Sequence, residues 1–94
     1  SNNISVAKKL YVGNLSYTMT SQELRSAFEQ YGSVSDAVVL SDKLTGKSRG
    51  FGFVTMDDDS AAMAAIQAMH GQDMGGRQIV VNEARPLEER GPRN

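Results

Sequence analysis

The order of strand-like and helix-like hydrophobic patterns is the feature that most constrains the fold of this chain. Segments with the two-residue alternation of a β-strand begin at Lys9, Val34, Arg49 and Ile79. Segments with helical spacing begin at Thr20 and Asp58. The resulting order is strand–helix–strand–strand–helix–strand, which predicts a four-stranded antiparallel sheet with two helices packed on one face.

Both predicted helices carry start and stop signals. Thr20 and Glu23 have the T-x-x-E spacing of a capping box, and Gly32 follows the apolar stripe of the first helix. That stripe consists of Leu24, Ala27, Phe28 and Tyr31. Asp58 is the predicted cap of the second helix, which Gly71 ends. The stripe of the second helix consists of Ala62, Ala65, Ile66 and Met69.

Alternation along the strands assigns each side chain to one face of the sheet. The positions predicted to face the helices are all apolar: Leu10, Val12, Val39, Val54, Met56, Ile79 and Val81. The same alternation places Tyr11, Phe51 and Phe53 on the other face. This is the α+β, ferredoxin-like βαββαβ sandwich, and it leaves one face of the sheet open to water.

Composition limits the class of protein. The chain has 94 residues, a net charge of -1 and no cysteine, which indicates one domain without disulfides or a cysteine-based zinc site. No apolar run approaches membrane-spanning length, and the N-terminus lacks the apolar segment of a signal peptide. These features predict a cytoplasmic protein with no cofactor, no metal and no membrane partner.

The open face carries groups that suit nucleic acid. Aromatic rings on neighbouring strands offer flat surfaces on which unstacked bases can lie. Lys9 and Arg49 are placed to neutralise phosphates at the edge of the rings, and Lys47 lies in the adjoining loop. Gly13, beside Tyr11, leaves room for a base, and Gly52 is expected to allow close helix packing.

Two sequence motifs on the first and third strands resemble those of the RNA recognition motif family. Residues 47–56, Lys-Ser-Arg-Gly-Phe-Gly-Phe-Val-Thr-Met, resemble its octamer signature, and residues 10–15, Leu-Tyr-Val-Gly-Asn-Leu, resemble its hexamer. The finer pattern at 45–50 and 81–86 is similar to short bacterial RNA-binding proteins and to glycine-rich, cold-inducible proteins of plants and animals. The expected divisions are a flexible N-terminus (1–7), the family domain (8–85) and a disordered charged tail (86–94).

The resemblance implies roles for individual residues. Bases would stack on Tyr11 and Phe53, Phe51 would contact the sugars, and Arg49 would pair with a phosphate. Val38 and Leu40 share the open face but are apolar, which argues against strong phosphate contacts along the second strand. The implied partner is single-stranded RNA, bound by a monomer in post-transcriptional regulation or RNA chaperoning. Single-stranded DNA stays open as a second ligand, and a bacterial source is favoured.

The segment after the last strand is predicted to recognise base edges. Asn82 offers a donor and an acceptor, Glu83 offers an acceptor, and the main chain of Ala84 and Arg85 offers more of each. The alternative is that Asn82 and Glu83 merely end a strand.

Other functions find less support in the sequence. A protein-interaction module could use the same fold, although this chain keeps all three aromatic residues on the open face. An enzyme lacks support because the chain shows no paired acid and base and no phosphate cradle. His70 is interpreted as a solvated residue at a helix end. Tyr17 is interpreted as a packed loop residue, with contact to RNA as the alternative.

Overall fold

The computed structural model describes residues 7–46 and 48–84. Its helices are α1 (Ser21–Glu29) and α2 (Asp59–Met69). Its strands are β1 (Lys8–Gly13), β2 (Val34–Ser41), β3 (Ser48–Met56), β4 (Asp73–Met74), β5 (Arg77–Gln78) and β6 (Val80–Glu83). Neither helix in this part of the chain is long and apolar enough to cross a bilayer. The predicted flexible N-terminus (except Ala7) and charged tail lie outside the described residues.

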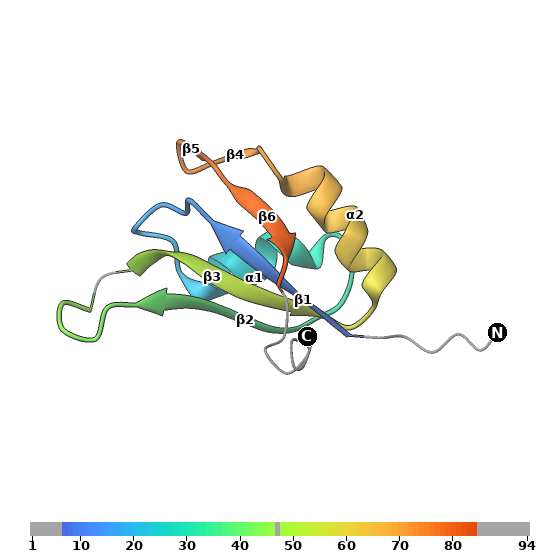
Figure 1. The fold of residues 1–94 in the computed structure, drawn as a ribbon, viewed down its shortest axis with the longest axis horizontal. Coiled ribbons are helices and arrows are strands. Elements are labelled where there is room, and N and C mark those ends of the chain that lie inside the picture. Colours follow the sequence, from blue (N-terminus) through green and yellow to red (C-terminus); the bar gives the residue numbers. More distant parts are fainter. Residues whose placement is uncertain (1–6, 47, 85–94) are drawn as a thin grey trace, which may run out of the picture.

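Four strands form one sheet in the order β2-β3-β1-β6, with every neighbouring pair antiparallel. Figure 1 shows these strands side by side, with β1 and β3 in the middle of the sheet. Tyr11 is paired with Phe53 on one side and with Asn82 on the other. The predicted α+β fold and its strand order along the chain are confirmed.

Both helices begin at the predicted caps. Thr20 Oγ1 accepts a hydrogen bond from the main-chain N–H of Glu23, and Glu23 Oε1 accepts one from the N–H of Thr20. These reciprocal bonds satisfy two amides that the first helical turn leaves without partners. At α2, hydrogen bonds from the Ser60 side chain and the Ala61 N–H hold the pKa of the Asp58 carboxyl below its ordinary value.

The core lies between the helices and one face of the sheet. Leu24 and Phe28 of α1 are fully buried there, as are Ala62 and Ala65 of α2. Their partners on the strands are the predicted apolar positions: Leu10, Val12, Val54, Met56 and Val81, with Ile79 beside them. Val39 packs against this cluster while only partly buried. The helices therefore cover a single face, as predicted.

Two features between α2 and β6 differ from the sequence expectation. The segment around Gly75-Gly76, predicted as a turn, forms a small hairpin of β4 and β5. His70 is exposed, as expected, but its Nδ1 also accepts a hydrogen bond from the N–H of Val81 at 3.1 Å. It is therefore a link between the end of α2 and the sheet, which its position in the sequence does not reveal.

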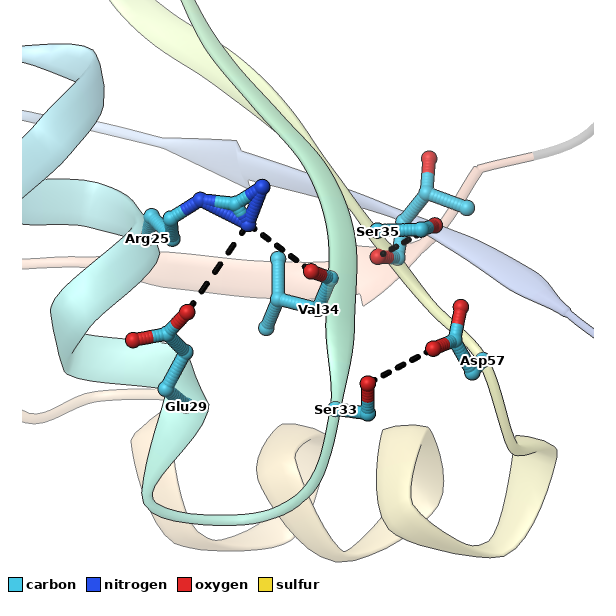
Figure 2. A network of polar contacts seen from close by, with 7 residues as sticks. Arg25, Glu29, Ser33, Val34, Ser35 and Asp57 are labelled. Carbon is cyan, nitrogen blue, oxygen red and sulfur yellow. Dashed lines mark hydrogen bonds and ion pairs between the residues drawn. The ribbon is translucent and has the colours of Figure 1, made fainter.

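A polar network fastens the end of the sheet where β2 begins and β3 ends (Figure 2). Arg25 Nη1 donates to the carbonyl of Val34 at 2.8 Å and lies 3.8 Å from the carboxylate of Glu29. Ser33 Oγ donates to Asp57 at 2.6 Å, and the N–H of Asp57 donates to the carbonyl of Ser33. These groups bind one another, so this end of the sheet has a structural role.

Candidate nucleic-acid interface

Three aromatic side chains gather on the face of the sheet that the helices leave open. We call Tyr11, Phe51 and Phe53 the aromatic cluster. Their ring centroids lie 5.8 Å (Tyr11–Phe51), 6.0 Å (Tyr11–Phe53) and 6.1 Å (Phe51–Phe53) apart. All three side chains are partly exposed, and none belongs to the buried core. The alternation in the sequence therefore predicted this face correctly.

Two glycines shape the surroundings of the cluster. A Cβ on Gly13 would lie 2.5 Å from Tyr11 Oη, so the glycine gives the tyrosine ring the space to lie across the end of β1. Gly52 points away from the cluster, where a Cβ would overlap the main chain of Val38 and Val39. The expectation that Gly52 admits a helix is wrong, because the close neighbour is strand β2.

Two cations lie over the rings of the cluster. Lys9 Nζ is 4.8 Å from the centroid of Phe53, and Arg49 Cζ is 5.8 Å from the centroid of Phe51. Both side chains are exposed, and within residues 7–46 and 48–84 neither forms an ion pair. A ligand that stacks on the cluster would therefore meet a positive charge at either end. Lys47, the third predicted cation, lies outside the described residues.

The open face of β2 is mainly apolar. Val38 pairs with Phe53 and therefore lies on the open face, since cross-strand partners share a face. Leu40 is partly buried and falls where the register between β2 and β3 shifts. Asp36, which the sequence analysis did not consider, pairs with Thr55 and places an exposed carboxylate near the start of β2. The negative charge there disfavours a phosphate near Asp36.

The two residues of β6 that were predicted to recognise bases lie on opposite faces of the sheet. Asn82 pairs with Tyr11 and is exposed beside the aromatic cluster, as predicted. Glu83 pairs with Leu10 and so shares its face, away from the cluster. Its carboxylate accepts a hydrogen bond from Lys8 Nζ at 2.8 Å. Arg85 lies outside the described residues.

The loop after β1 contains an aromatic side chain that the sequence analysis misplaced. Tyr17 was expected to be packed, but 64% of its surface is exposed. Arg77 Cζ lies 5.6 Å from the centroid of its ring, although the two residues are far apart in the sequence. The one available signal is the aromatic residue itself in a polar loop, Ser16-Tyr17-Thr18.

Comparisons of the sequence and of the structure with known proteins agree with one another. The sequence model of the RNA recognition motif family matches residues 10–80. RbpE of Nostoc sp. is 49% identical over 85 residues, which cover 90% of this chain and 86% of RbpE. Glycine-rich RNA-binding protein blt801 of Hordeum vulgare is 49% identical over 79 residues, 84% of this chain but only 49% of that protein. The crystal structure of RNA binding protein PG1 superimposes with a TM-score of 0.81 at 44% identity, covering 84% of this chain and 98% of PG1.

Proposed function

The chain belongs to the RNA recognition motif family, and from this premise we propose that it binds single-stranded RNA by stacking bases on the aromatic cluster. The observation that carries the proposal is the position of the three rings. They lie within about 6 Å of one another on the sheet face without helices, while every core position is aliphatic or supplied by a helix. The family is one of binding domains and not of enzymes, in agreement with the sequence analysis.

Two kinds of contact contribute to the proposed binding: base stacking on the aromatic rings, and attraction between the cations and the phosphates. An aromatic ring contributes about 1–3 kcal/mol per stacked base and tolerates any base, because every base has a π face. Lys9 lies over the ring of Phe53 and Arg49 over the ring of Phe51, where each can reach the phosphates of a stacked strand. An antiparallel duplex hides the faces of its bases, so this surface favours single strands.

Selectivity among sequences requires hydrogen bonds to base edges, which the rings cannot supply. Asn82, exposed beside Tyr11, has both a donor and an acceptor amide group. We propose that it contacts the edge of the base stacked on Tyr11. The position of Glu83 supports this role less well, since its carboxylate binds Lys8.

The biological setting follows from the ligand. A small domain that binds single strands suits post-transcriptional regulation or RNA chaperoning, and we propose such a role for a cytoplasmic monomer of residues 8–85. The match to RbpE of Nostoc sp. supports a bacterial source. The match to the Hordeum vulgare protein is equally high, so identity alone does not separate the two sources.

Binding of a labelled RNA tests the proposal. A fluorescein-labelled octanucleotide pool of randomised RNA is titrated with wild type, Phe53→Ala and the control Met63→Ala, and anisotropy is recorded. Met63 is an exposed apolar residue on α2, away from the open face. Phe53→Ala is expected to raise Kd by about 5- to 150-fold, which corresponds to about 1–3 kcal/mol, and the control should leave it unchanged.

The outcomes separate the alternatives. Wild-type protein that does not bind the pool would contradict the proposed function. Equal affinity of wild type and Phe53→Ala would contradict stacking on the cluster. The same titration with a randomised DNA octanucleotide shows whether the 2′-hydroxyl contributes, because a site that contacts it binds RNA more tightly than DNA.

A further inference from the structure

Tyr17 lies in the loop between β1 and α1, at the end of the sheet where β1 ends and β3 begins. Its 64% exposure is high for an aromatic residue, and within the described residues the other exposed large apolar side chains are Leu44 and Met63. Burial in the core therefore does not account for a tyrosine at this position.

Tyr17 adjoins the aromatic cluster through β3. The N–H of Leu15 donates to the carbonyl of Gly50 at 2.8 Å, which ties the start of the loop to the residue before Phe51. Gly50 has a φ of +85°, and a Cβ at this position would lie 3.2 Å from Tyr17 Cε1. The ring of Tyr17 thus lies against the main chain next to Phe51, and this contact leaves little space for a larger residue than glycine.

Arg77 is held over the ring of Tyr17 by a second set of contacts. Its Cζ is 5.6 Å from the ring centroid, and its Nε and Nη2 donate to Asn14 Oδ1 at 3.3 and 2.8 Å. Asn14 in turn donates from Nδ2 to the carbonyl of Gln78 at 2.7 Å. Asn14 has a φ of +58°, a left-handed conformation in which asparagine is one of the favoured residues. The arginine is therefore positioned before any ligand arrives.

The guanidinium retains capacity for a ligand. Of its five N–H groups, the bonds to Asn14 use one on Nε and one on Nη2. Arg77 is exposed and forms no ion pair within the part of the chain that the structure describes. A planar, positioned guanidinium with free donors is well suited to a phosphate.

Tyr17 also lines a shallow hollow between its own loop and the loop that joins β2 and β3. The hollow has a volume of about 280 Å³, and its lining includes Ser21, Val39, Ser41 and Gly46. Val39 faces the helices, so this hollow lies on the helix side of the sheet edge and is not part of the open face.

We propose that Tyr17 and Arg77, held in place by Asn14, form a second nucleotide site that continues the aromatic cluster beyond the end of the sheet. The ring of Tyr17 stacks on a base and Arg77 binds an adjoining phosphate of the same RNA strand. This inference rests on the proposed function, because it needs a strand already bound to the cluster. It extends the binding surface by one nucleotide at the Gly13–Phe51 end.

A tryptophan reporter tests the position of the site directly. The chain contains no tryptophan, so Tyr17→Trp introduces a single one and keeps an aromatic ring at this position. Binding of the randomised RNA octanucleotide should quench its fluorescence, with the same midpoint as the anisotropy of the labelled pool. Unchanged fluorescence while anisotropy reports binding would overturn the second site and leave the proposed function standing. Failure of wild-type protein to bind would instead contradict the proposed function.

Substitutions that remove the ring or the charge give an independent measurement. Tyr17→Ala should raise Kd for the octanucleotide at least about fivefold, whereas Tyr17→Phe should bind as wild type. Arg77→Gln should lower affinity and make the log–log salt slope less steep by about 0.7, whereas Arg77→Lys should preserve the slope. Leu44→Ala, at a residue 93% exposed in the loop after β2, is the control for a surface apolar residue.

The length of the RNA separates the two sites. The loss caused by Phe53→Ala should be present for a randomised dinucleotide and an octanucleotide, measured by competition against the labelled pool. The loss caused by Tyr17→Ala should be smaller for the dinucleotide, which is too short to occupy the cluster and the Tyr17 site together. An equal loss at both lengths, or no loss at either, would contradict a site beyond the cluster.

Discussion

The two faces of the sheet use the same strands for different purposes. On the covered face Leu10, Val12 and Val54 are fully buried, whereas their neighbours Tyr11 and Phe53 on the open face remain partly exposed. Because successive residues of a strand point to opposite faces, one strand contributes to the core and to the ligand surface. We therefore expect substitutions on the covered face to change stability and substitutions on the open face to change RNA binding, even where the two residues are neighbours in the chain.

The largest expected effect comes from the covered face. Leu10→Ala removes a fully buried side chain from the core and should lower the free energy of unfolding by about 2–5 kcal/mol. Urea denaturation followed by circular dichroism measures this loss. RNA affinity, corrected for the folded fraction, should stay close to that of the wild type. A specific loss of affinity in the folded protein would mean that the two faces are not independent.

Substitution of Tyr11, the neighbour of Leu10 on the open face, should weaken RNA binding and leave stability nearly unchanged. Tyr11→Ala removes a stacking surface and should weaken binding of the RNA octanucleotide by about 1–3 kcal/mol. Its ring lies outside the buried core, so the free energy of unfolding should change little. Anisotropy and urea denaturation of the same sample measure both quantities. A stability loss as large as that of Leu10→Ala would break the comparison.

The salt dependence of RNA binding measures how much the cations near the open face contribute to affinity. If Lys9, Arg49 and some of Lys47, Arg77 and Arg85 make roughly two to four phosphate contacts, as proposed, the slope of log K against log salt should be about -1.5 to -3. Titrations of the RNA octanucleotide over a series of KCl concentrations give this slope. A slope near -6 would indicate a basic surface elsewhere, because single strands release about 0.7 counterion per contact.

Sequence preference should depend on the edge of the open face. Asn82→Ala combined with Arg85→Ala removes an amide beside Tyr11 and a neighbouring cation, and should weaken binding to the best RNA by about 1–2 kcal/mol. The loss on poly-pyrimidine should be smaller, which narrows the difference between the two ligands. An equal loss on both RNAs would show that this edge adds affinity without selecting sequence.

The smallest effect is expected at Asp58, far from the open face. The lowered pKa of this carboxyl means that the folded state favours the charged form. Its contribution to stability is therefore present above the ordinary carboxyl pKa and is lost as pH falls through the lowered value. Asp58→Asn keeps a capping group without a charge and should remove this part of the pH dependence, measured by thermal unfolding. RNA affinity at neutral pH should not change.

Local patterns predicted much of the fold because their causes lie within a few residues. The capping box at Thr20, the cap at Asp58 and the two-residue alternation through Phe51 and Phe53 depend on neighbours in the chain. The hairpin of β4 and β5 escaped prediction because its strands have two residues each, too few to show a pattern. Gly52 was assigned to the correct face but to the wrong neighbour, since the main chain of β2 occupies that space.

The sequence by itself determined the strand and helix order, the apolar core and the aromatic cluster, because each follows from periodicity along the chain. Only the tertiary structure decided which distant groups meet. It placed Arg77 over the ring of Tyr17, formed the ion pair between Lys8 and Glu83, and formed the hydrogen bond from the N–H of Val81 to His70. These contacts depend on the register of β6 with β1 and on the path of the loops, which no local pattern encodes. The proposed second nucleotide site rests on the contact between Arg77 and Tyr17, so only the folded chain suggests it.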